Sequence, residues 1–380
     1  MWFSVWCFVV TATSAGLRTP GGQAPYHPTA FSRSTNELRS QQPLSYDGHA
    51  ARSNRLLATL KLPRIPAVFA YIRKFFGFAR PFAVKGLIAT VTASAAAQQP
   101  AQNRPARPLP DIFLATMTTG NGMPRIGSPL NITDRAGYDN QPAFSRDERA
   151  IFFTSVREDA QADIYRYDIG TKRITRVTRT APESEYSATP IESGRAISVV
   201  RVERDSTQRL WRFPLNGGAP SVIVERVRPV GYHAWADDHT VALFVLGSPN
   251  ALLLVDTHSG TADTIASGIG RSLSRIPGTR RISFVRVESP VSWIESLDPA
   301  TRAIKRLVAL PQGVEDYAWL PNGTLVCGQD SRLLWWSGKS GEDWREIADL
   351  TSANVKGITR LAVSPNGDRI ALVAIGRAGP

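Results

Sequence analysis

The sequence predicts an all-β protein with six blades around an axis, a β-propeller, and three observations support this fold class. One pattern of strands and turns recurs after residue 110. The recurrence has the length of a four-stranded propeller blade, which is about 40–45 residues. The last copy of the pattern is only half a unit, and a matching half lies at the start of the repeat region.

The copies align on one small apolar position of their first strand. The aligned residues are Ala143, Ala188, Ala234, Leu273, Ala318 and Ala362. They are 45, 46, 39, 45 and 44 residues apart. The copies cover 142–178, 186–224, 232–266, 271–308 and 317–350, with a half-copy at 360–374. Each full copy reads as four short strands joined by turns, and "LPNGT" and "SPNGD" contain the Asn-Gly pair that favours tight hairpins.

The missing half-unit lies at the other end of the repeats. Segment 111–133, "DIFLATMTTGNGMPRIGSPLNIT", resembles "DIYRYDIGTKRITRVT" at 163–178. We therefore expect 111–133 to supply the outer two strands of a closing blade and 358–374 its inner two. A shared blade leaves no exposed sheet edge. Five whole blades and one shared blade make six.

The clearest copy also carries a recognisable signature, P-x-F-S-x-D-x-x-x-I-x-F-x-S-x-R followed by D-I-Y-x-x-D and a final T. Its residues are Pro142, Phe144, Ser145, Asp147, Ile151, Phe153, Ser155, Arg157, Asp163, Ile164, Tyr165, Asp168 and Thr178. This signature resembles the WD-like repeat of TolB-like six-bladed β-propellers, and 362–374 is a second match. The resemblance covers 111–374. It implies a link to cell-envelope proteins whose propellers dock partners on their loop faces, but residues 1–110 lack the α/β pattern of TolB's additional domain.

The first part of the chain does not read as a folded domain. Segment 1–97 contains a stretch rich in Ser, Thr, Pro, Gly and Arg that favours disorder. Lys85, the apolar "GLIATVTAS" and an A-x-A site ending at Ala97 resemble an export signal, with Gln98 as the mature start. We expect a mis-extended start, a Pro/Gln-rich linker over 98–110, and a short tail at 375–380.

Two other interpretations of this segment stay open. The apolar run Trp2–Val10 is an alternative signal, although it lacks a basic n-region. Residues around 67–80 also fit an amphipathic surface helix. No apolar run of 18 uncharged residues occurs, so no spanning helix is expected. The predicted location is periplasmic or secreted.

Charge and cysteine content exclude several classes of protein. The net charge of +13 is concentrated in residues 1–110, which carry +11, whereas 111–380 carry only +2. A clustered basic face marks nucleic-acid binding, and the repeat region has none, so no nucleic-acid partner is predicted. Cys7 and Cys327 are far apart and lie in no metal-binding spacing. Cys327 is expected to be a small buried residue.

No catalytic motif is apparent. There is no G-x-S-x-G, no H-E-x-x-H and no Gly-rich phosphate loop between a strand and a helix. We predict no catalytic residues, no metal and no cofactor. Five acidic residues recur at equivalent positions and are expected to satisfy backbone amides of turns: Asp147, Asp163, Asp168, Asp256 and Asp298. Seven tryptophans are expected to pack between blades: Trp211, Trp235, Trp293, Trp319, Trp335, Trp336 and Trp344.

The loops that lead into the first strand of each blade carry the candidate binding residues. Tyrosines recur there beside acidic groups or histidine. The set is Tyr138, Asp139, Glu185, Tyr186, Tyr232, His233, Glu315, Asp316 and Tyr317. Aromatic and acidic groups around one funnel suit a basic peptide or a sugar, and packing of the tyrosines at blade edges is the alternative. We expect that replacing Tyr186 and Tyr232 by Ala abolishes capture of a partner.

The leading interpretation is an exported, monomeric, non-enzymatic propeller that binds a protein, a peptide or another ligand in the cell envelope. The alternative is a propeller hydrolase or lyase with its active site at the mouth of the channel, possibly metal-dependent. A third interpretation is a non-functional or truncated propeller. One fold hosts many functions, so the sequence leaves the choice to the geometry of the site.

Overall fold

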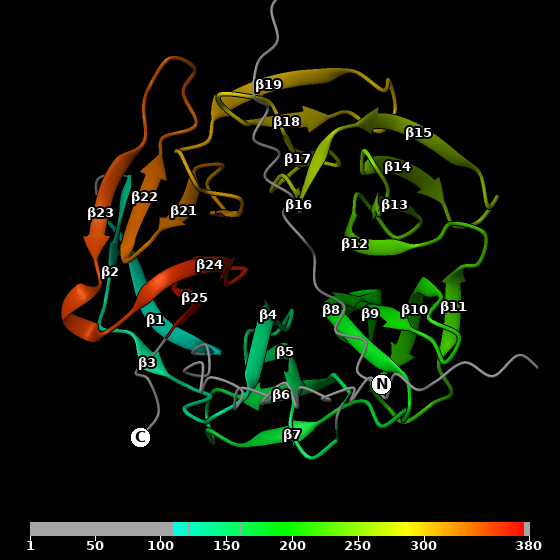
Figure 1. Ribbon diagram of the computed structural model, residues 1–380. Coiled ribbons are helices and arrows are strands. Elements are labelled where there is room, and N and C mark those ends of the chain that lie inside the picture. The colour runs from blue at the N-terminus through cyan, green and yellow to red at the C-terminus, as the bar shows by residue number, and fades with distance from the viewer. Residues whose placement is uncertain (1–108, 121, 160, 376–380) are drawn as a thin grey trace, which may run out of the picture. The chain divides into compact units, whose positions relative to one another are not determined.

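The computed structural model describes residues 109–120, 122–159 and 161–375. Six antiparallel sheets form a ring in which each sheet is one blade (Figure 1). The predicted six-bladed propeller is confirmed. Segment 1–97 with its predicted export signal, nearly all of the predicted linker 98–110 and most of the tail lie outside the described residues.

The closing blade takes strands from both ends of the repeat region, as expected. From the axis outward its order is β24, β25, β1 and β2, and β3 also pairs with β1. Their bounds are β1 (Pro110–Gly120), β2 (Met123–Ile126), β3 (Leu130–Asn131), β24 (Lys356–Val363) and β25 (Arg369–Ile375). In the seam between β1 and β25, Phe113 lies opposite Leu372. The first and last described strands therefore hold the ring closed together.

Each of the other five blades is a four-stranded meander of consecutive strands. The first two contain β4 (Tyr138–Phe144), β5 (Ala150–Val156), β6 (Asp163–Asp168), β7 (Ile174–Arg176), β8 (Ser184–Ile191), β9 (Ala196–Val202), β10 (Gln208–Pro214) and β11 (Ser221–Val224). The next two contain β12 (Val230–Trp235), β13 (Thr240–Val245), β14 (Ala251–Asp256), β15 (Ala262–Ser267), β16 (Ile269–Arg275), β17 (Ile282–Arg286), β18 (Trp293–Leu297) and β19 (Ile304–Ala309). The last contains β20 (Tyr317–Trp319), β21 (Leu325–Gln329), β22 (Arg332–Trp336) and β23 (Arg345–Asp349).

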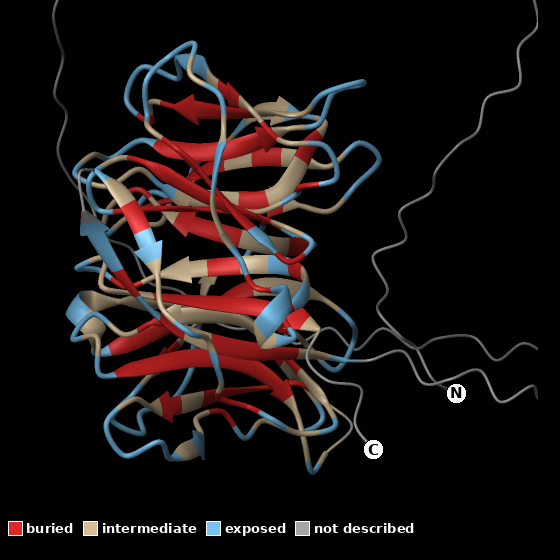
Figure 2. Ribbon diagram, turned by 90° about the vertical axis from the view of Figure 1, so that its left-hand side faces the viewer, coloured by how far each residue is buried: buried red, intermediate tan, exposed pale blue. Residues whose placement is uncertain are grey.

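Burial follows the position of a strand within its blade. The second strands are apolar almost throughout, and β5, with sequence "AIFFTSV", has six consecutive buried residues. Both faces of such a strand are covered because neighbouring blades pack against both sides. Outermost strands such as β19 are largely exposed. Figure 2 shows the buried residues concentrated in the strands and the exposed ones in the turns.

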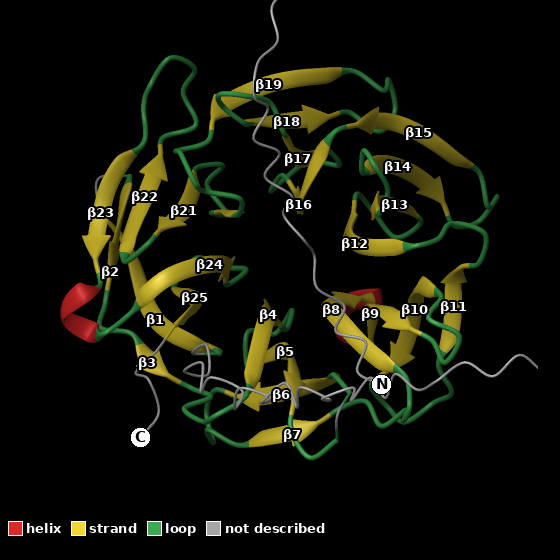
Figure 3. Ribbon diagram, viewed as in Figure 1, coloured by secondary structure: helices red, strands yellow, loops and turns green. Residues whose placement is uncertain are grey.

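Helices contribute little to the described residues. Two single-turn 3-10 helices occur, η1 (Glu192–Gly194) and η2 (Thr351–Ala353) (Figure 3). No helix in the described ranges is long and apolar enough to cross a membrane.

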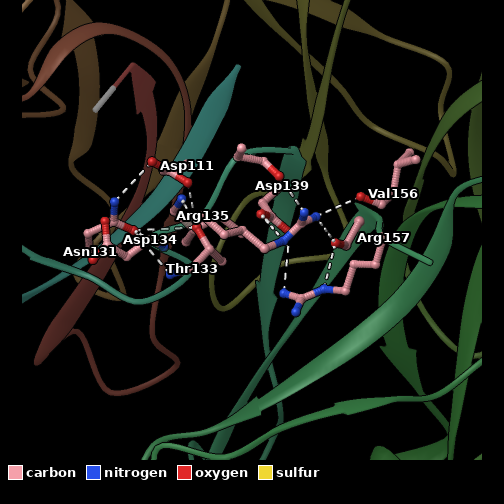
Figure 4. Close-up of polar contacts among 11 residues, drawn as sticks. Asp111, Asn131, Thr133, Asp134, Arg135, Asp139, Val156 and Arg157 are labelled. Atoms are coloured by element: carbon pink, nitrogen blue, oxygen red, sulfur yellow. Dashed lines mark hydrogen bonds and ion pairs between the residues drawn. The ribbon is translucent and has the colours of Figure 1, made fainter. Parts of the chain in front are cut away.

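The signature residues explain why the two outer half-units look alike in sequence. In the first complete blade, the Thr178 hydroxyl accepts from the Ile164 N–H at 2.9 Å and donates to Asp163 at 2.9 Å. In the closing blade, Thr133 makes the same two contacts, with the N–H of Ile112 at 3.0 Å and with Asp111 at 3.1 Å (Figure 4). The repeated D-I…T pattern is thus a hydrogen-bonded tie between the third strand and the end of its blade.

Four of the five recurring acidic residues satisfy turns, as predicted, and Asp147 does so by accepting from the Arg149 N–H at 3.2 Å. The prediction is wrong for Asp163, which accepts from the Thr178 hydroxyl and pairs with Arg176 at 2.6 Å. Asp168, Asp256 and Asp298 each accept backbone N–H groups from the turn that follows them. These hydrogen bonds lower the pKa of all three carboxyls. The Asn-Gly turns are also confirmed, because Gly323 and Gly367 adopt φ of 80° and 78°, in the left-handed region that favours glycine.

Cys327 lies in strand β21 with no exposed surface, and it packs in an apolar cluster. Burial raises the pKa of its thiol. The prediction that it is a small buried residue is confirmed.

Candidate functional site

A cavity of about 640 Å³ lies at the axis of the ring, and residues from the innermost strands of all six blades line it. Its rim is formed at the turns between the first and second strands, where Arg146, Asp238, Arg275 and Pro365 are exposed. We call this side of the ring the turn face, and the opposite side the loop face. Among the described residues of the loops that lead into the first strands, only Asp316, immediately before β20, belongs to the lining. The cavity therefore opens on the turn face.

At the end of the cavity away from the turn face, each blade contributes one lining residue. These six residues, which we call the floor ring, are Gln141, Ser187, Tyr232, Arg271, Asp316 and Arg360. No residue nearer the start of a first strand belongs to the lining. The lining therefore ends at the level of the floor ring.

Hydrogen bonds between blades close the floor. Strands β12 and β24 lie on opposite sides of the ring (Figure 1). Arg360 of β24 donates from Nη2 to the hydroxyl of Tyr232 at 2.8 Å and places its guanidinium 4.9 Å from the centre of the tyrosine ring. Asp316 accepts from the Ser272 hydroxyl and, at 3.1 Å, from the Leu361 N–H. Three blades thus meet at one carboxylate, while Arg360 spans the axis.

Gln141 and Ser187 complete the floor on the other side. The side-chain oxygen of Gln141 accepts from the Ser187 N–H at 2.9 Å and from the Thr154 hydroxyl at 2.8 Å. Gln141 and Ser187 both adopt a positive φ, 57° and 55°. Strands β4 and β8 carry a register shift at this level. Such bulges re-aim side chains, and here they lie where the first strands reach the floor.

Three of the predicted tyrosines converge near the floor. Burial raises the pKa of Tyr138 to about 12, and its charged or titratable neighbours include Arg360, Tyr232 and Tyr186. Burial also raises the pKa of Tyr186. Tyr138 and Tyr186 do not line the cavity, so they lie behind the floor ring, on the side of the loop face.

Two predicted acidic residues are buried and already paired. Asp139 has no exposed surface and lies 3.2 Å from Arg135 Nε and 3.6 Å from Arg157 Nη2 (Figure 4). Glu185 is equally buried, accepts from the Thr180 hydroxyl at 2.5 Å and lies 3.4 Å from Arg201 Nε.

Burial raises the pKa of both carboxyls, whereas their hydrogen bonds and the arginines lower it. A buried carboxylate that loses its partner costs several kcal/mol, about 3–5. The pairing of Asp139 and Glu185 therefore holds the loops behind the floor in place.

The remaining two predicted acidic residues, Glu315 and Asp316, differ in position. Asp316 belongs to the floor ring, and its two oxygens accept the hydrogen bonds from Ser272 and Leu361. Glu315 lies outside the cavity with 62% of its side chain exposed, and it is 3.4 Å from Arg271 Nε. Four predicted residues line the cavity, namely Tyr232, His233, Asp316 and Tyr317.

His233 and Tyr317 occupy equivalent positions, one residue before the aligned alanine of the repeat. Both are buried. His233 Nε2 and the Trp235 indole reach the hydroxyl of Ser198 in the preceding blade, at 2.7 and 2.9 Å. Burial lowers the pKa of His233 to about 3, so the ring is neutral at physiological pH.

The equivalent contacts recur two blades later. The Tyr317 hydroxyl and the Trp319 indole both donate to the Ser283 hydroxyl, each at 2.8 Å. Trp235 and Trp319 thus tie neighbouring blades together, as the sequence predicts for its tryptophans. His233 differs in one respect, because its Nδ1 is buried and has no hydrogen-bond partner among the described residues.

Four floor residues were not among the sequence candidates, and one of them, Ser187, lies one residue before its aligned alanine. The other three, Gln141, Arg271 and Arg360, share a column of the repeat with Tyr232 and Asp316, two residues before the aligned position. That shared column is the signal that identifies them. It is less visible than the recurring tyrosines because its chemistry varies from blade to blade.

The histidines on the turn face form a pair. The rings of His239 and His258 are 5.3 Å apart, and His239 Nδ1 lies 3.3 Å from Asp237. Across the described ranges, no group of three or more His, Cys, Asp or Glu side chains is arranged to hold a metal ion.

Comparison with solved structures places this ring among the six-bladed β-propellers. A putative TolB from Agrobacterium tumefaciens superposes with a TM-score of 0.55 at 15% identity, covering 71% of this chain and 99% of that one. TolB from Acinetobacter baumannii gives 0.47 at 12% identity, covering 70% and 64%. An oligogalacturonate lyase in complex with manganese gives 0.46 at 17% identity, covering 66% and 80%. No protein-family model and no curated protein matches the sequence.

The fold and site together define a six-bladed β-propeller with a cavity on its axis. More particularly, the chain has the TolB-like propeller fold, in agreement with the signature of its repeats.

Proposed function

We propose that this chain is an exported, non-enzymatic binding module of the cell envelope and that the axial cavity is its binding site. One observation carries the proposal: a cavity of about 640 Å³ ends in a ring of polar side chains, one from each blade. Ligand pockets of proteins commonly enclose about 300–1,000 Å³ and orient their ligand through a few polar groups.

The cavity suits a compact ligand. A free small molecule fits such a volume, and so does one side chain or chain end presented by a partner protein. A partner larger than this would contact the rim on the turn face. Of the sequence candidates, Tyr232, His233 and Asp316 would contact the ligand, while Tyr138 and Tyr186 would support the floor from behind.

The test is to block the cavity. Ser274 lines it and is half-buried, so Ser274→Trp introduces a bulky group into the lumen. Ser221→Trp, on an exposed position of the outermost strand β11, is the matched control. Each protein is incubated with a mixture of metabolites and short peptides, separated by gel filtration and analysed by mass spectrometry.

A compound retained by the wild type and Ser221→Trp but lost from Ser274→Trp supports the proposal. Equal retention by all three proteins contradicts the cavity as the site. Chemical conversion of the retained compound with time contradicts the non-enzymatic assignment and favours a hydrolase or lyase.

Export is tested separately by determining the mature N-terminus of the protein purified from its native host. We expect a chain that begins near Gln98 and is recovered from the cell envelope or the medium. Recovery of peptides from residues 20–60 in the mature protein would contradict export through the proposed signal.

A further inference from the structure

Several polar atoms of the cavity wall have no partner. Three of them are Ser187 Oγ, His233 Nδ1 and Arg360 Nε, each buried and without a hydrogen-bond partner among the described residues. All three residues line the cavity, and His233 is only 7% exposed. Buried polar groups are nearly always paired with protein, water or ligand. Because these unpaired groups belong to residues around one cavity, they indicate which hydrogen-bonding groups a ligand would supply.

We assign the ring hydrogen of His233 to one of its two nitrogens by comparison with the equivalent position, Tyr317. Ser283 accepts from Tyr317 and Trp319 and donates its own hydrogen to the Ser274 carbonyl at 3.0 Å. Ser198 has the same three neighbours, namely His233, the Trp235 indole and the Thr189 carbonyl at 3.4 Å.

By this correspondence, Nε2 of His233 carries the hydrogen and donates to Ser198. The neutral imidazole then has a bare lone pair on Nδ1. That atom accepts a hydrogen bond, so its natural partner is a hydroxyl or N–H donor on the ligand.

The floor ring, in contrast to the acceptor on His233, supplies positively charged hydrogen-bond donors. It holds two guanidinium groups, Arg271 and Arg360, and a single carboxylate, Asp316. Both oxygens of Asp316 already accept hydrogen bonds, and Glu315, which lies 3.4 Å from Arg271 Nε, is largely exposed outside the cavity. Guanidinium groups pair with carboxylate or phosphate through parallel hydrogen bonds. The floor is therefore suited to one negative charge.

We propose that the cavity binds a small hydroxylated anion, with its anionic group on Arg271 and Arg360 and a hydroxyl donating to His233 Nδ1. This assignment rests on the proposed function of the cavity. A hydroxylated carboxylate and a sugar phosphate share this chemistry, and the experiment distinguishes them.

Binding is measured by isothermal titration calorimetry on the full chain with four probes. Gluconate and glucose 6-phosphate carry both features, glucose lacks the charge, and hexanoate lacks the hydroxyl groups. We expect at least one of the first two to bind at least tenfold more tightly than both glucose and hexanoate. Preference for gluconate assigns a carboxylate ligand, and preference for glucose 6-phosphate assigns a phosphate.

Any other ranking overturns the proposed ligand class. If glucose binds as tightly as the anions, and Ser274→Trp removes that binding, the cavity remains a binding site and only its charge preference is wrong. If Ser274→Trp leaves the binding of every probe unchanged, the cavity itself is not the site.

Variants then test the two halves of the assignment. His233→Tyr installs the side chain found at the equivalent position 317, which donates to its serine, and it removes the Nδ1 acceptor. It is expected to weaken the preferred anion at least fivefold while leaving hexanoate unchanged. An unchanged affinity for the preferred anion would contradict the role of His233.

Arg360→Gln and Arg271→Gln each remove one floor charge and are expected to weaken the preferred anion at least tenfold. Arg302→Gln, at an exposed turn outside the cavity, is the matched control and should bind as the wild type does. Because Arg360 also holds Tyr232, circular dichroism and thermal melting verify the fold, and Arg271→Gln decides the question if Arg360→Gln is unfolded. Wild-type affinity in a folded floor variant would overturn the anion site.

Discussion

Two interfaces of this propeller contain the same arrangement with one residue exchanged. Between β9 and β12 a serine holds His233 and Trp235, and between β17 and β20 a serine holds Tyr317 and Trp319. In the second interface every polar atom of the aromatic pair is satisfied. In the first, His233 lines the cavity and its Nδ1 has no hydrogen-bond partner among the described residues.

The difference teaches that a repeated position can serve stability in one blade and recognition in another. Tyrosine at this position completes the packing of two blades, since Tyr317 belongs to an apolar cluster with Trp319 and Cys327. Histidine fills the position with a smaller ring and leaves an acceptor for a ligand. Stability measurements on both interfaces can separate these two uses.

The largest effect is expected from removing the serine hydroxyls. Ser283→Ala leaves the Tyr317 hydroxyl and the Trp319 indole buried without an acceptor. A buried unsatisfied group costs about 1–3 kcal/mol, so the free energy of unfolding should fall by about 3 kcal/mol. Ser198→Ala should cost about half as much, because Trp235 is only half-buried. Urea unfolding measures both, and an equal or smaller loss for Ser283→Ala would break the comparison.

The second effect is a loss of folding stability at low pH, which the interface with His233 should show and the interface with Tyr317 should not. The pKa of His233 is about 3 in the folded protein, below the value of about 6.5 for an unfolded chain. The unfolded state therefore binds more protons between these values. This part of the stability is complete above about pH 6.5 and is lost as pH falls, by about 1.4 kcal/mol per pH unit.

Comparing His233→Tyr with the wild type isolates that loss, because the other titrating groups are common to both proteins. At pH 5 the wild type should have lost about 2 kcal/mol more than the variant, relative to pH 7.5. Urea unfolding at both pH values measures the difference. Parallel pH profiles for the two proteins would show that His233 is not buried as a neutral ring.

A smaller effect is expected from exchanging the aromatic residues. Tyr317→His shortens a side chain in a well-packed cluster and should destabilise the protein by about 2 kcal/mol, as large-to-small changes in cores do. His233→Tyr should cost less than about 1.5 kcal/mol, because the added ring extends beside the cavity and keeps a hydroxyl for Ser198. Thermal melting ranks the two variants. The reverse order would mean that the interfaces are not equivalent.

The smallest change should be a local one, reported by the thiol of Cys327. This residue lies opposite Tyr317 in the pairing of β20 with β21. In a Cys7→Ser background, labelling by a thiol reagent should be several-fold faster in Tyr317→His than in His233→Tyr, since only the former loosens this blade. Equal labelling rates would place the effect of Tyr317→His outside its own blade.

The fold could be predicted because each blade carries its own local information. The D-I…T tie, the Ser145–Asp147 turn with its hydrogen bond of 2.6 Å and the Asn-Gly turns all operate within a few tens of residues. Even the shared closing blade was visible, since Asp111 and Thr133 repeat the pattern of Asp163 and Thr178. The candidate site was predicted less completely. Tyr232, His233, Asp316 and Tyr317 line the cavity, but four floor residues were missed, namely Gln141, Ser187, Arg271 and Arg360.

The physical reason lies in the first strands. Five of the six contain a register shift, for example between Tyr186 and Thr189 and between Asn140 and Ala143. A bulge changes which side chain faces the axis, and simple alternation along the strand does not indicate where it falls.

The sequence by itself determined the number of blades, the shared closure and the chemistry of the turns, because these depend on spacing and on contacts within one repeat. Only the tertiary structure decided that Arg360 meets Tyr232, 128 residues away and across the axis. It alone also placed the two arginines of the floor and the open nitrogen of His233 around one cavity. Those contacts join different blades, so no pattern within a single repeat encodes them.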